Sequence, residues 1–342
     1  MDMAKYSVGI FGVGDAAIQY ALAVQSNPLT ELVAAVSRDR VKTGERLKNI
    51  GMEQVEVLND YNDLISNKGL DIIINTGPHQ MHAQETIKAA EAGIHVMFEK
   101  PVGMTFKEVQ DVYHAVKASG IKTQQGSPLI FNPYMKNLLK LIDDGYLGKL
   151  FYLQADHAHT LDHWPGLSWG GDKRKGGPSA PLVTGIHAVA ALRRLGGEVE
   201  EVCGYQTWGH KLNYEYAPTF AAVLKFKSGA IGNISSTYEA ESPYIRDFVI
   251  HGSKGSVRND AFFLKELFPG QTDWQKFETT LPDSGDVSSH SFRDLWDDFI
   301  DAIDNDRPSA VNIEVTLKTH EICYAITESM ENGKIVKLPL AD

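Results

Sequence analysis

The chain has 342 residues, of which 43% are hydrophobic and 23% are charged, a balance typical of a globular protein with more than one core. Its net charge of −11 excludes a broad basic surface for nucleic acid or anionic lipid. Two cysteines far apart, Cys203 and Cys323, favour a reducing compartment over a disulfide framework. No apolar run approaches the roughly 20 residues of a membrane span, so we expect a cytoplasmic protein with no nucleic-acid or membrane partner.

The first third of the chain alternates short β-branched runs with helical patterns, as a doubly wound parallel sheet requires. Thr105 and Glu108 have the spacing of a helix capping box, and Gly120 is suited to end that helix. The alternation predicts an α/β Rossmann domain over residues 1–125. The strands are expected at residues 6–11, 32–36, 55–58, 71–75, 95–98 and 122–125, and the helices at 16–26, 85–92 and 105–120.

The rest of the chain has a different rhythm, with longer strand-like stretches separated by Gly-containing turns. It predicts an α+β domain over residues 126–342, with a large, mostly antiparallel, open sheet and helices on one face. Strands are expected at residues 150–157, 221–226, 230–238, 247–251 and 335–338, and helices at 133–144, 187–195, 292–305 and 313–332.

A GxGxxA sequence stands between the first predicted strand and the first predicted helix. Gly12 suits the tight turn, Gly14 lets the backbone approach a pyrophosphate, and the small Ala17 lets helix and strand pack closely. In this context the motif predicts dinucleotide binding, although a glycine turn that binds nothing is the alternative. The expected cofactor contacts are Gly12, Val13, Gly14, Asp15 and Ala16.

The end of the second strand bears on the choice between NAD(H) and NADP(H). An acidic residue is expected there when the ribose 2′-hydroxyl is to be held, but this chain has Ser37 and Arg38. A guanidinium suits a 2′-phosphate, so the sequence slightly favours NADP(H). Asp39 could still turn inward and favour NAD(H), and Arg38 could simply be solvated.

Polar residues also follow the fourth and fifth strands, whose carboxyl ends border the ligand crevice of such a sheet. Thr76 and His82 follow the fourth strand and are expected to contact the cofactor, although His82 could instead cap the next helix. Glu99 and Lys100 follow the fifth strand and are expected to contact the cofactor too. A lysine in a dry crevice can stabilise an alkoxide and tune proton transfer, whereas a lone lysine is more often a surface residue.

Taken together, these motifs resemble those of the glucose-fructose oxidoreductase, inositol dehydrogenase and MocA (Gfo/Idh/MocA) family over almost the entire chain. The most specific segment is residues 92–101, which ends in Glu-Lys-Pro. The other matching segments are residues 12–17, 71–76 with His82, 131–133, 145–149, 185–187, 224–229 and 252–255.

The resemblance implies that the N-terminal domain holds a nicotinamide cofactor and that Lys100 is catalytic, with Glu99 and a cis Pro101 shaping the site. It also implies a substrate between the cofactor and the open face of the second-domain sheet, and a homodimer or homotetramer formed through that sheet. The family pattern has an aspartate four residues before His187, where this chain has Val183, and often an arginine where this chain has Ile130. His187 remains the best general acid/base, because imidazole titrates near neutral pH; a satisfied helix-start histidine is the alternative.

A histidine-rich segment could replace the missing carboxylate, because it holds three histidines and two acids within eight residues. In a strand His157 and His159 would share one face, while Asp156 would point away. The spacing does not match a metal site cleanly, so no metal is expected, and contact with a polyhydroxylated ligand is as plausible as simple packing. The expected substrate contacts are Lys100, His157, His159, His163, Trp164, Thr184 and His187.

The principal hypothesis is an NAD(P)-dependent dehydrogenase or reductase that acts on a CH–OH group of a sugar, polyol or carbohydrate derivative. A second hypothesis keeps the cofactor but has no net redox change, as in a redox-assisted glycosidase. A third is a non-catalytic regulatory protein that binds NAD(P). Lys100 and His187 argue against the third hypothesis, and Val183 argues faintly for it.

Overall fold

The computed structural model describes residues 6–66, 69–160, 171–209, 212–277 and 290–341. The chain divides into two compact units, of which unit 1 comprises Met1–Pro128 with His290–Leu317, and unit 2 comprises Leu129–Ser289 with Lys318–Asp342. Among the described residues, no helix has both the length and the apolar character that crossing a bilayer requires.

Unit 1 contains the predicted Rossmann sheet, with six parallel strands in the order β3-β2-β1-β4-β5-β6. Val8 of the central strand lies between Leu32 and Ile72 and, like them, is almost completely buried, because helices cover both faces of such a sheet. The strands are β1 (Tyr6–Phe11), β2 (Thr30–Val36), β3 (Glu56–Leu58), β4 (Ile72–Asn75), β5 (His95–Phe98) and β6 (Thr123–Gln125).

The helices of this half include two that the sequence did not reveal, α2 and α3. Both are short and polar, so they lack a wide apolar stripe, and each begins at an aspartate N-cap, Asp39 and Asp60 respectively. The predicted capping box of Thr105 and Glu108 is confirmed at the start of α5. The helices are α1 (Asp15–Ser26), α2 (Arg40–Lys48), α3 (Tyr61–Ile65), the 3₁₀ turn η1 (His79–Met81), α4 (His82–Glu91) and α5 (Phe106–Ser119).

A late segment of the chain completes unit 1, which differs from the predicted single boundary at residue 125. Helix α8 (Phe292–Asp304) packs on α1, with the rings of Phe292 and Tyr20 4.7 Å apart. The fully buried Trp296 donates an indole hydrogen bond to Thr30, at 3.3 Å. The amphipathic pattern predicted this helix, but not the unit to which it belongs. The long helix α9 (Ile313–Asn332) follows, and its first residues also belong to unit 1.

Unit 2 is built on a nine-stranded sheet in the order β14-β13-β12-β11-β7-β10-β9-β8-β15. Among the described strands of this sheet only β7 and β10 pair in parallel, so the predicted, mostly antiparallel sheet is confirmed. Strands β8, β12, β13 and β14 were not predicted; β8 carries two glutamates and a glycine, which weaken its pattern. The strands are β7 (Leu150–Ala158), β8 (Val199–Thr207), β9 (Thr219–Phe226), β10 (Ile231–Thr237), β11 (Ile245–Gly252), β12 (Ser256–Arg258), β13 (Ala261–Phe263), β14 (Gln275–Lys276) and β15 (Val336–Lys337).

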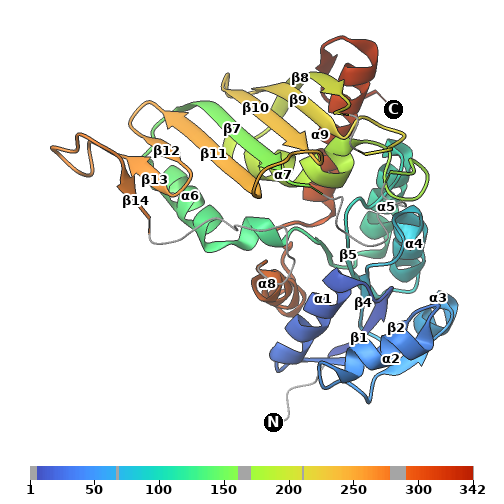
Figure 1. Cartoon of the computed structure of the whole chain (residues 1–342). Coiled ribbons are helices and arrows are strands. Elements are labelled where there is room, and N and C mark those ends of the chain that lie inside the picture. Colours follow the sequence, from blue (N-terminus) through green and yellow to red (C-terminus); the bar gives the residue numbers. More distant parts are fainter. Residues whose placement is uncertain (1–5, 67–68, 161–170, 210–211, 278–289, 342) are drawn as a thin grey trace. The chain divides into compact units, whose positions relative to one another are not determined.

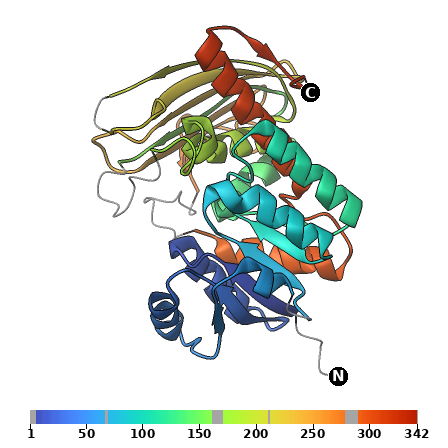
Figure 2. The same cartoon turned by 90° about the vertical axis from the view of Figure 1, so that its right-hand side faces the viewer.

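One face of this sheet is covered by helices and the other is open (Figures 1 and 2). Along β7, Leu153 and Ala155 are buried in a core shared with the helices, whereas Gln154 and Asp156 on the opposite face are only half-buried. The helices of this half are the 3₁₀ turn η2 (Pro128–Phe131), α6 (Pro133–Asp143), the π-helical turn η4 (Pro181–Gly185), α7 (Ile186–Gly196) and the later part of α9.

Candidate functional site

The glycine turn between β1 and α1 has the geometry that the motif predicts. Gly12 has φ +84°, and a Cβ there would lie 2.6 Å from the carbonyl oxygen of Thr76, so no other residue fits. A Cβ on Gly14, by contrast, would meet no atom of the described residues within 4 Å. Space on the outer side of Gly14 is what a closely approaching ligand needs.

The start of α1 fits a phosphate group. Gly14 is the N-cap and has no side chain, so it does not cap the first-turn amides itself. The negative charge of Asp15 would repel an anion, but Arg46 forms an ion pair with Asp15 at 2.6 Å and compensates that charge. Gly14 and Asp15 are exposed, whereas Val13 and Ala16 are half-buried, so the predicted cofactor contacts form an accessible turn.

Thr76 supports this turn from β4. Its backbone N–H donates to the carbonyl of Phe11, and its hydroxyl lies 2.6 Å from the carbonyl oxygen of Gly12. These bonds explain why a threonine follows the strand. Thr76 therefore holds the backbone that would carry the pyrophosphate.

In the segment after β2, the side chain of Asp39 has a defined orientation. Its carboxylate accepts the backbone N–H of Lys42 at 3.0 Å and caps α2, so it is directed into its own helix. Ser37 is half-buried, and its hydroxyl accepts the N–H of Asp39 at 3.3 Å. Arg38 is exposed. The alternative in which Asp39 turns inward is therefore not the one found in this structure.

His82 is completely buried at the start of α4. Its Nδ1 lies 2.8 Å from the carbonyl oxygen of Pro101 and its Nε2 lies 2.8 Å from that of Gly77. Burial lowers the pKa of His82, which those two carbonyls partly oppose. The ring therefore lies between two loops, and the nitrogen that carries the proton donates to one of the two carbonyls, which favours a positioning role for His82 over a direct cofactor contact.

Glu99 and Lys100 lie at the carboxyl end of β5, both half-buried, and the Lys100–Pro101 peptide bond is cis, as the resemblance implied. Tyr20 of α1 donates its hydroxyl to Glu99 at 2.8 Å. The carboxylate also accepts the backbone N–H of Lys100 at 3.1 Å. A Cβ on Gly126 would lie 2.3 Å from Glu99, so a glycine leaves room for that carboxylate.

Burial moves the pKa values of this pair in opposite directions. It lowers the pKa of Lys100 below that of an ordinary lysine, while the charge of Glu99 raises it. It raises the pKa of Glu99, while Lys100 and Tyr20 lower it. A lysine with a lowered pKa can exchange a proton nearer to neutral pH than an exposed lysine can.

In unit 2, three of the predicted histidines come together on the helix-covered face of the sheet. The ring of His157 lies 5.1 Å from that of His159 and 6.5 Å from that of His187, in the first turn of α7. Tyr244 places its hydroxyl 3.2 Å from Nε2 of His157. His157 is 6% exposed, whereas His159, His187 and Tyr244 are half-buried, so the cluster reaches the surface of the unit.

Thr184 lies behind this cluster, in the π-helical turn before α7. It is 5% exposed, and its hydroxyl accepts a hydrogen bond from Ser236 of β10 at 3.0 Å. This hydrogen bond holds the turn before α7 in place, and therefore also His187 in the first turn of the helix. Single π-helical turns are frequent at functional sites.

The structure does not bring Asp156 to this cluster. It lies on the opposite face of β7, where Gln154 and Ser235 donate to it. Val183 packs against Gly177, where a Cβ would lie 2.2 Å from its side chain. His163 and Trp164 lie outside the described residues. Within the part of the chain that the structure describes, no group of three or more His, Cys, Asp and Glu residues is placed to hold a metal ion.

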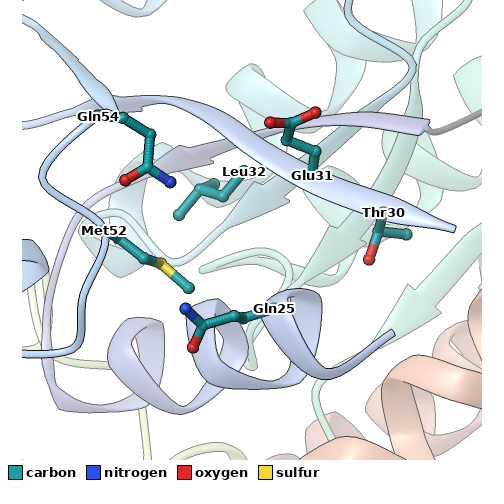
Figure 3. Close-up of a pocket in the computed structure, with 6 residues that line it drawn as sticks. All are labelled: Gln25, Thr30, Glu31, Leu32, Met52 and Gln54. Atoms are coloured by element: carbon teal, nitrogen blue, oxygen red, sulfur yellow. The ribbon is translucent and has the colours of Figure 1, made fainter. Parts of the chain in front are cut away.

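Unit 1 also has a pocket that lies apart from the glycine turn (Figure 3). It lies at the amino end of β2 and the last turn of α1, whereas the glycine turn follows the carboxyl end of β1. The two ends of parallel strands lie at opposite edges of the sheet, so this pocket is separate from the candidate site. It is lined by Gln25, Thr30, Glu31, Leu32, Met52 and Gln54.

Comparison with known families identifies both halves of the chain. Residues 6–127 match the family model described as "Oxidoreductase family, NAD-binding Rossmann fold", GFO_IDH_MocA. Residues 139–338 match its companion, "Oxidoreductase family, C-terminal alpha/beta domain". The chain belongs to the Gfo/Idh/MocA oxidoreductase family. The predicted family, oxidoreductase class and NAD-binding Rossmann domain are therefore confirmed, whereas a preference for NADP(H) is not shown by these matches.

Relatives and solved structures of this family are similar to the chain over different lengths. The myo-inositol 2-dehydrogenase of Thermotoga maritima is 25% identical over 347 residues, which span 97% of this chain and 98% of the relative. A solved levoglucosan dehydrogenase, in complex with NADH and L-sorbose, superposes with a TM-score of 0.88 at 22% identity, covering 99% of this chain and 100% of the other.

Other matches are partial. The 2,7-anhydro-N-acetylneuraminate hydratase of Escherichia coli is 26% identical over 226 residues, 63% of this chain and 59% of the relative. The uncharacterized oxidoreductase YrbE of Bacillus subtilis is 28% identical over 214 residues, 60% of either chain.

Sequence reasoning missed three residues of these sites. Tyr20 and Gly126 contact Glu99, and Tyr244 contacts His157. Tyr20 had a local signal, because it lies one helical turn beyond the GxGxxA motif. Gly126 directly follows the last Rossmann strand, and a glycine there is a sign of close approach. Tyr244 had no local signal, because only the register of β11 against β7 brings it to the histidines.

Proposed function

We propose that this protein transfers hydride between a nicotinamide dinucleotide and a CH–OH carbon of a sugar, a polyol or a related carbohydrate. The observation that carries the proposal is the half-buried Lys100 with its lowered pKa, in a Rossmann unit whose glycine turn is shaped for a pyrophosphate. The names of relatives that act on inositol and levoglucosan support the substrate class.

The residues have distinct roles in this proposal. The turn at Gly12 and Gly14 binds the pyrophosphate, and Thr76 and His82 hold the surrounding backbone in position. The cofactor, when bound, accepts or supplies the hydride. Lys100 and His187 take up or deliver the proton of the reacting hydroxyl, and Glu99 keeps the pKa of Lys100 from falling further.

His157 and His159 are proposed to donate hydrogen bonds to the other hydroxyls of the substrate. We extend the same proposal to Thr184, and to His163 and Trp164, which lie outside the described residues.

The test is turnover of a panel of polyols and sugars with NAD⁺ and NADP⁺, followed by the absorbance of the reduced nicotinamide. Oxidation of at least one cyclic polyol or anhydrosugar is expected. Absence of turnover with every carbohydrate, in either direction and with cofactor binding demonstrated, would remove the proposal.

For the cofactor, we propose that Ser37 and Arg38 allow NADP(H) to bind in preference to NAD(H). The orientation of Asp39 into α2 supports this, because no carboxylate then competes with a 2′-phosphate at that point. Arg38→Ala should weaken NADP(H) about tenfold, equivalent to about 1.4 kcal/mol, and leave NAD(H) nearly unchanged. Arg40→Ala is the matched control, because Arg40 is also exposed and two residues away. Equal losses for both cofactors in Arg38→Ala would contradict the assignment.

A second candidate is a reaction without net redox change, in which the substrate is oxidised transiently and reduced again after elimination. Val183 at the position of the family's aspartate and the hydratase among the relatives favour it. Cleavage of an aryl glycoside with no net change in nicotinamide absorbance would select this reaction over simple dehydrogenation.

We further propose that unit 2 forms a homodimer or homotetramer through the open face of its sheet. Tyr205, Val223 and Ile231 on that face are 75%, 49% and 50% exposed, and a second sheet packed on this face would cover them. Light scattering should give a multiple of the chain mass, and Val223→Lys should reduce it. A monomeric wild type would contradict this.

A further inference from the structure

A buried arginine next to the histidine cluster has no carboxylate partner among the residues that the structure describes. Arg246 in β11 is 7% exposed, and its strand position is directly opposite His157 of β7. Its guanidinium lies 5.6 Å from the ring centroid of Phe248 and hydrogen-bonds the hydroxyl of Tyr244. Among the described residues, no Asp or Glu forms an ion pair with it.

This arrangement is energetically unusual. Buried arginines are normally paired with an acid, because an unpaired charge loses its hydration without compensation. A guanidinium has five N–H donors, and a single phenol oxygen satisfies only a part of them. The nearest carboxylate in sequence, that of Asp247, points to the opposite face and accepts a hydrogen bond from Asn259 at 2.9 Å.

Arg246 is also connected to the candidate substrate site. Tyr244 bridges it to His157, whose ring in turn contacts those of His159 and His187. Only the side chain of Tyr244 therefore separates the guanidinium from the histidines that a ligand would contact. The charge of Arg246 would be compensated when such a ligand carries an anionic group.

We propose that Arg246 is a specificity-determining residue and that the carbohydrate substrate carries a carboxylate, as an aldonate or uronate does. This inference rests on the proposed function and deepens it. A planar guanidinium matches a carboxylate with two parallel hydrogen bonds. A carboxylate is favoured over a phosphate ester because a single positive charge compensates a single negative one. Of the described groups, only Tyr244 and Tyr134 act electrostatically on Arg246, with no second lysine or arginine.

The experiment compares pairs of substrates with the same stereochemistry, one neutral and one bearing a carboxylate, with a sugar phosphate as a third arm. The wild type should prefer the carboxylate in kcat/KM. Arg246→Gln should lower that value about 100-fold for the carboxylate, through KM, and change it only a few-fold for the neutral sugar. Arg246→Lys should restore part of the preference. Arg258→Gln is the matched control, because Arg258 is an exposed arginine of the same sheet.

Three outcomes would overturn the inference: a wild type that prefers neutral sugars, a wild type that prefers the phosphate ester, or equal losses for all substrates in Arg246→Gln. Arg246→Met removes the charge but keeps an apolar side chain over Phe248, so it should fold where Arg246→Gln does not. A folded Arg246→Met that loses the preference for the carboxylate shows that the charge, and not the fold, was responsible. If neither variant folds, competitive inhibition of the wild type by small carboxylates decides, and its absence counts against the inference.

Failure of the proposed function is distinguishable from failure of this inference. Calorimetric titration of sugar carboxylates into the NADH-saturated protein needs no turnover. If the wild type binds a sugar carboxylate, Arg246→Gln does not, and no carbohydrate is turned over, the anion site is supported and the dehydrogenase assignment is contradicted.

Discussion

The glycine turn of unit 1 and the histidine cluster of unit 2 are assembled in different ways. The turn is continuous in sequence, and its conformation follows from Gly12, Gly14 and the beginning of α1. The cluster joins His157 of β7, His187 of α7 and Tyr244 before β11, which only the register of the sheet brings together. A substitution in the glycine turn should therefore act by changing the local backbone. A substitution in the histidine cluster should act by changing the contacts of the neighbouring side chains.

The largest effect is expected at Lys100. Lys100→Met should reduce turnover about 10³-fold, because a positioned proton-transfer group contributes 10²–10⁴-fold, and should leave cofactor affinity nearly unchanged. Steady-state kinetics and NADH fluorescence give the two quantities. Lys107→Met, in an exposed position of α5, is the control. Undiminished turnover in Lys100→Met would refute the proposed role.

Substitution in the cluster should have a smaller effect. His187→Asn should lower kcat about 10²-fold and no further, because in the proposed site His157 and His159 would still bind the substrate. His251→Asn is a control in the same unit, since His251 hydrogen-bonds Ser256 away from the cluster. If His187→Asn has no effect on kcat, its function is only structural.

The glycine turn can be tested without disturbing the fold. Gly14→Ala should raise the dissociation constant of NAD(P)H about tenfold, while thermal stability changes little, because the new Cβ meets no atom in the described part of the chain. Gly44→Ala in α2 is the matched control, also without a clash, and should leave cofactor binding unchanged. Unaltered affinity in Gly14→Ala would argue that the pyrophosphate does not rest there.

The smallest expected effect is a displaced pH profile. Burial lowers the pKa of Lys100 and Glu99 raises it, so the rate of alcohol oxidation should rise with pH as Lys100 loses its proton. Glu99→Gln removes the charge that favours the protonated lysine, and the rising limb should move to lower pH. A limb that moves to higher pH would mean that another group controls it.

The sequence predicted most of unit 1, because its signals are local. The strands of the Rossmann sheet, the capping box at Thr105 and the shape of the Gly12 turn follow from neighbouring residues. Helices α2 and α3 were missed because they bury few residues and have no strong periodicity.

Unit 2 was less accessible to the same reasoning. The alternation of β7 predicted that His157 and His159 share a face, but the partners Tyr244 and Arg246 depend on pairing with a strand almost 90 residues later. Strand β8 was hidden because its glutamates lie on partly exposed positions. Register of this kind is set by tertiary packing, which no local pattern encodes.

The return of α8 to unit 1 has a consequence for how the protein is made. The ring of Phe292 and the indole of Trp296 close the side of α1, and they lie more than 160 residues beyond the last Rossmann strand. During synthesis the nucleotide-binding half therefore has to wait, with that hydrophobic side uncovered, until the whole nine-stranded sheet domain has left the ribosome except for its final helix and strand.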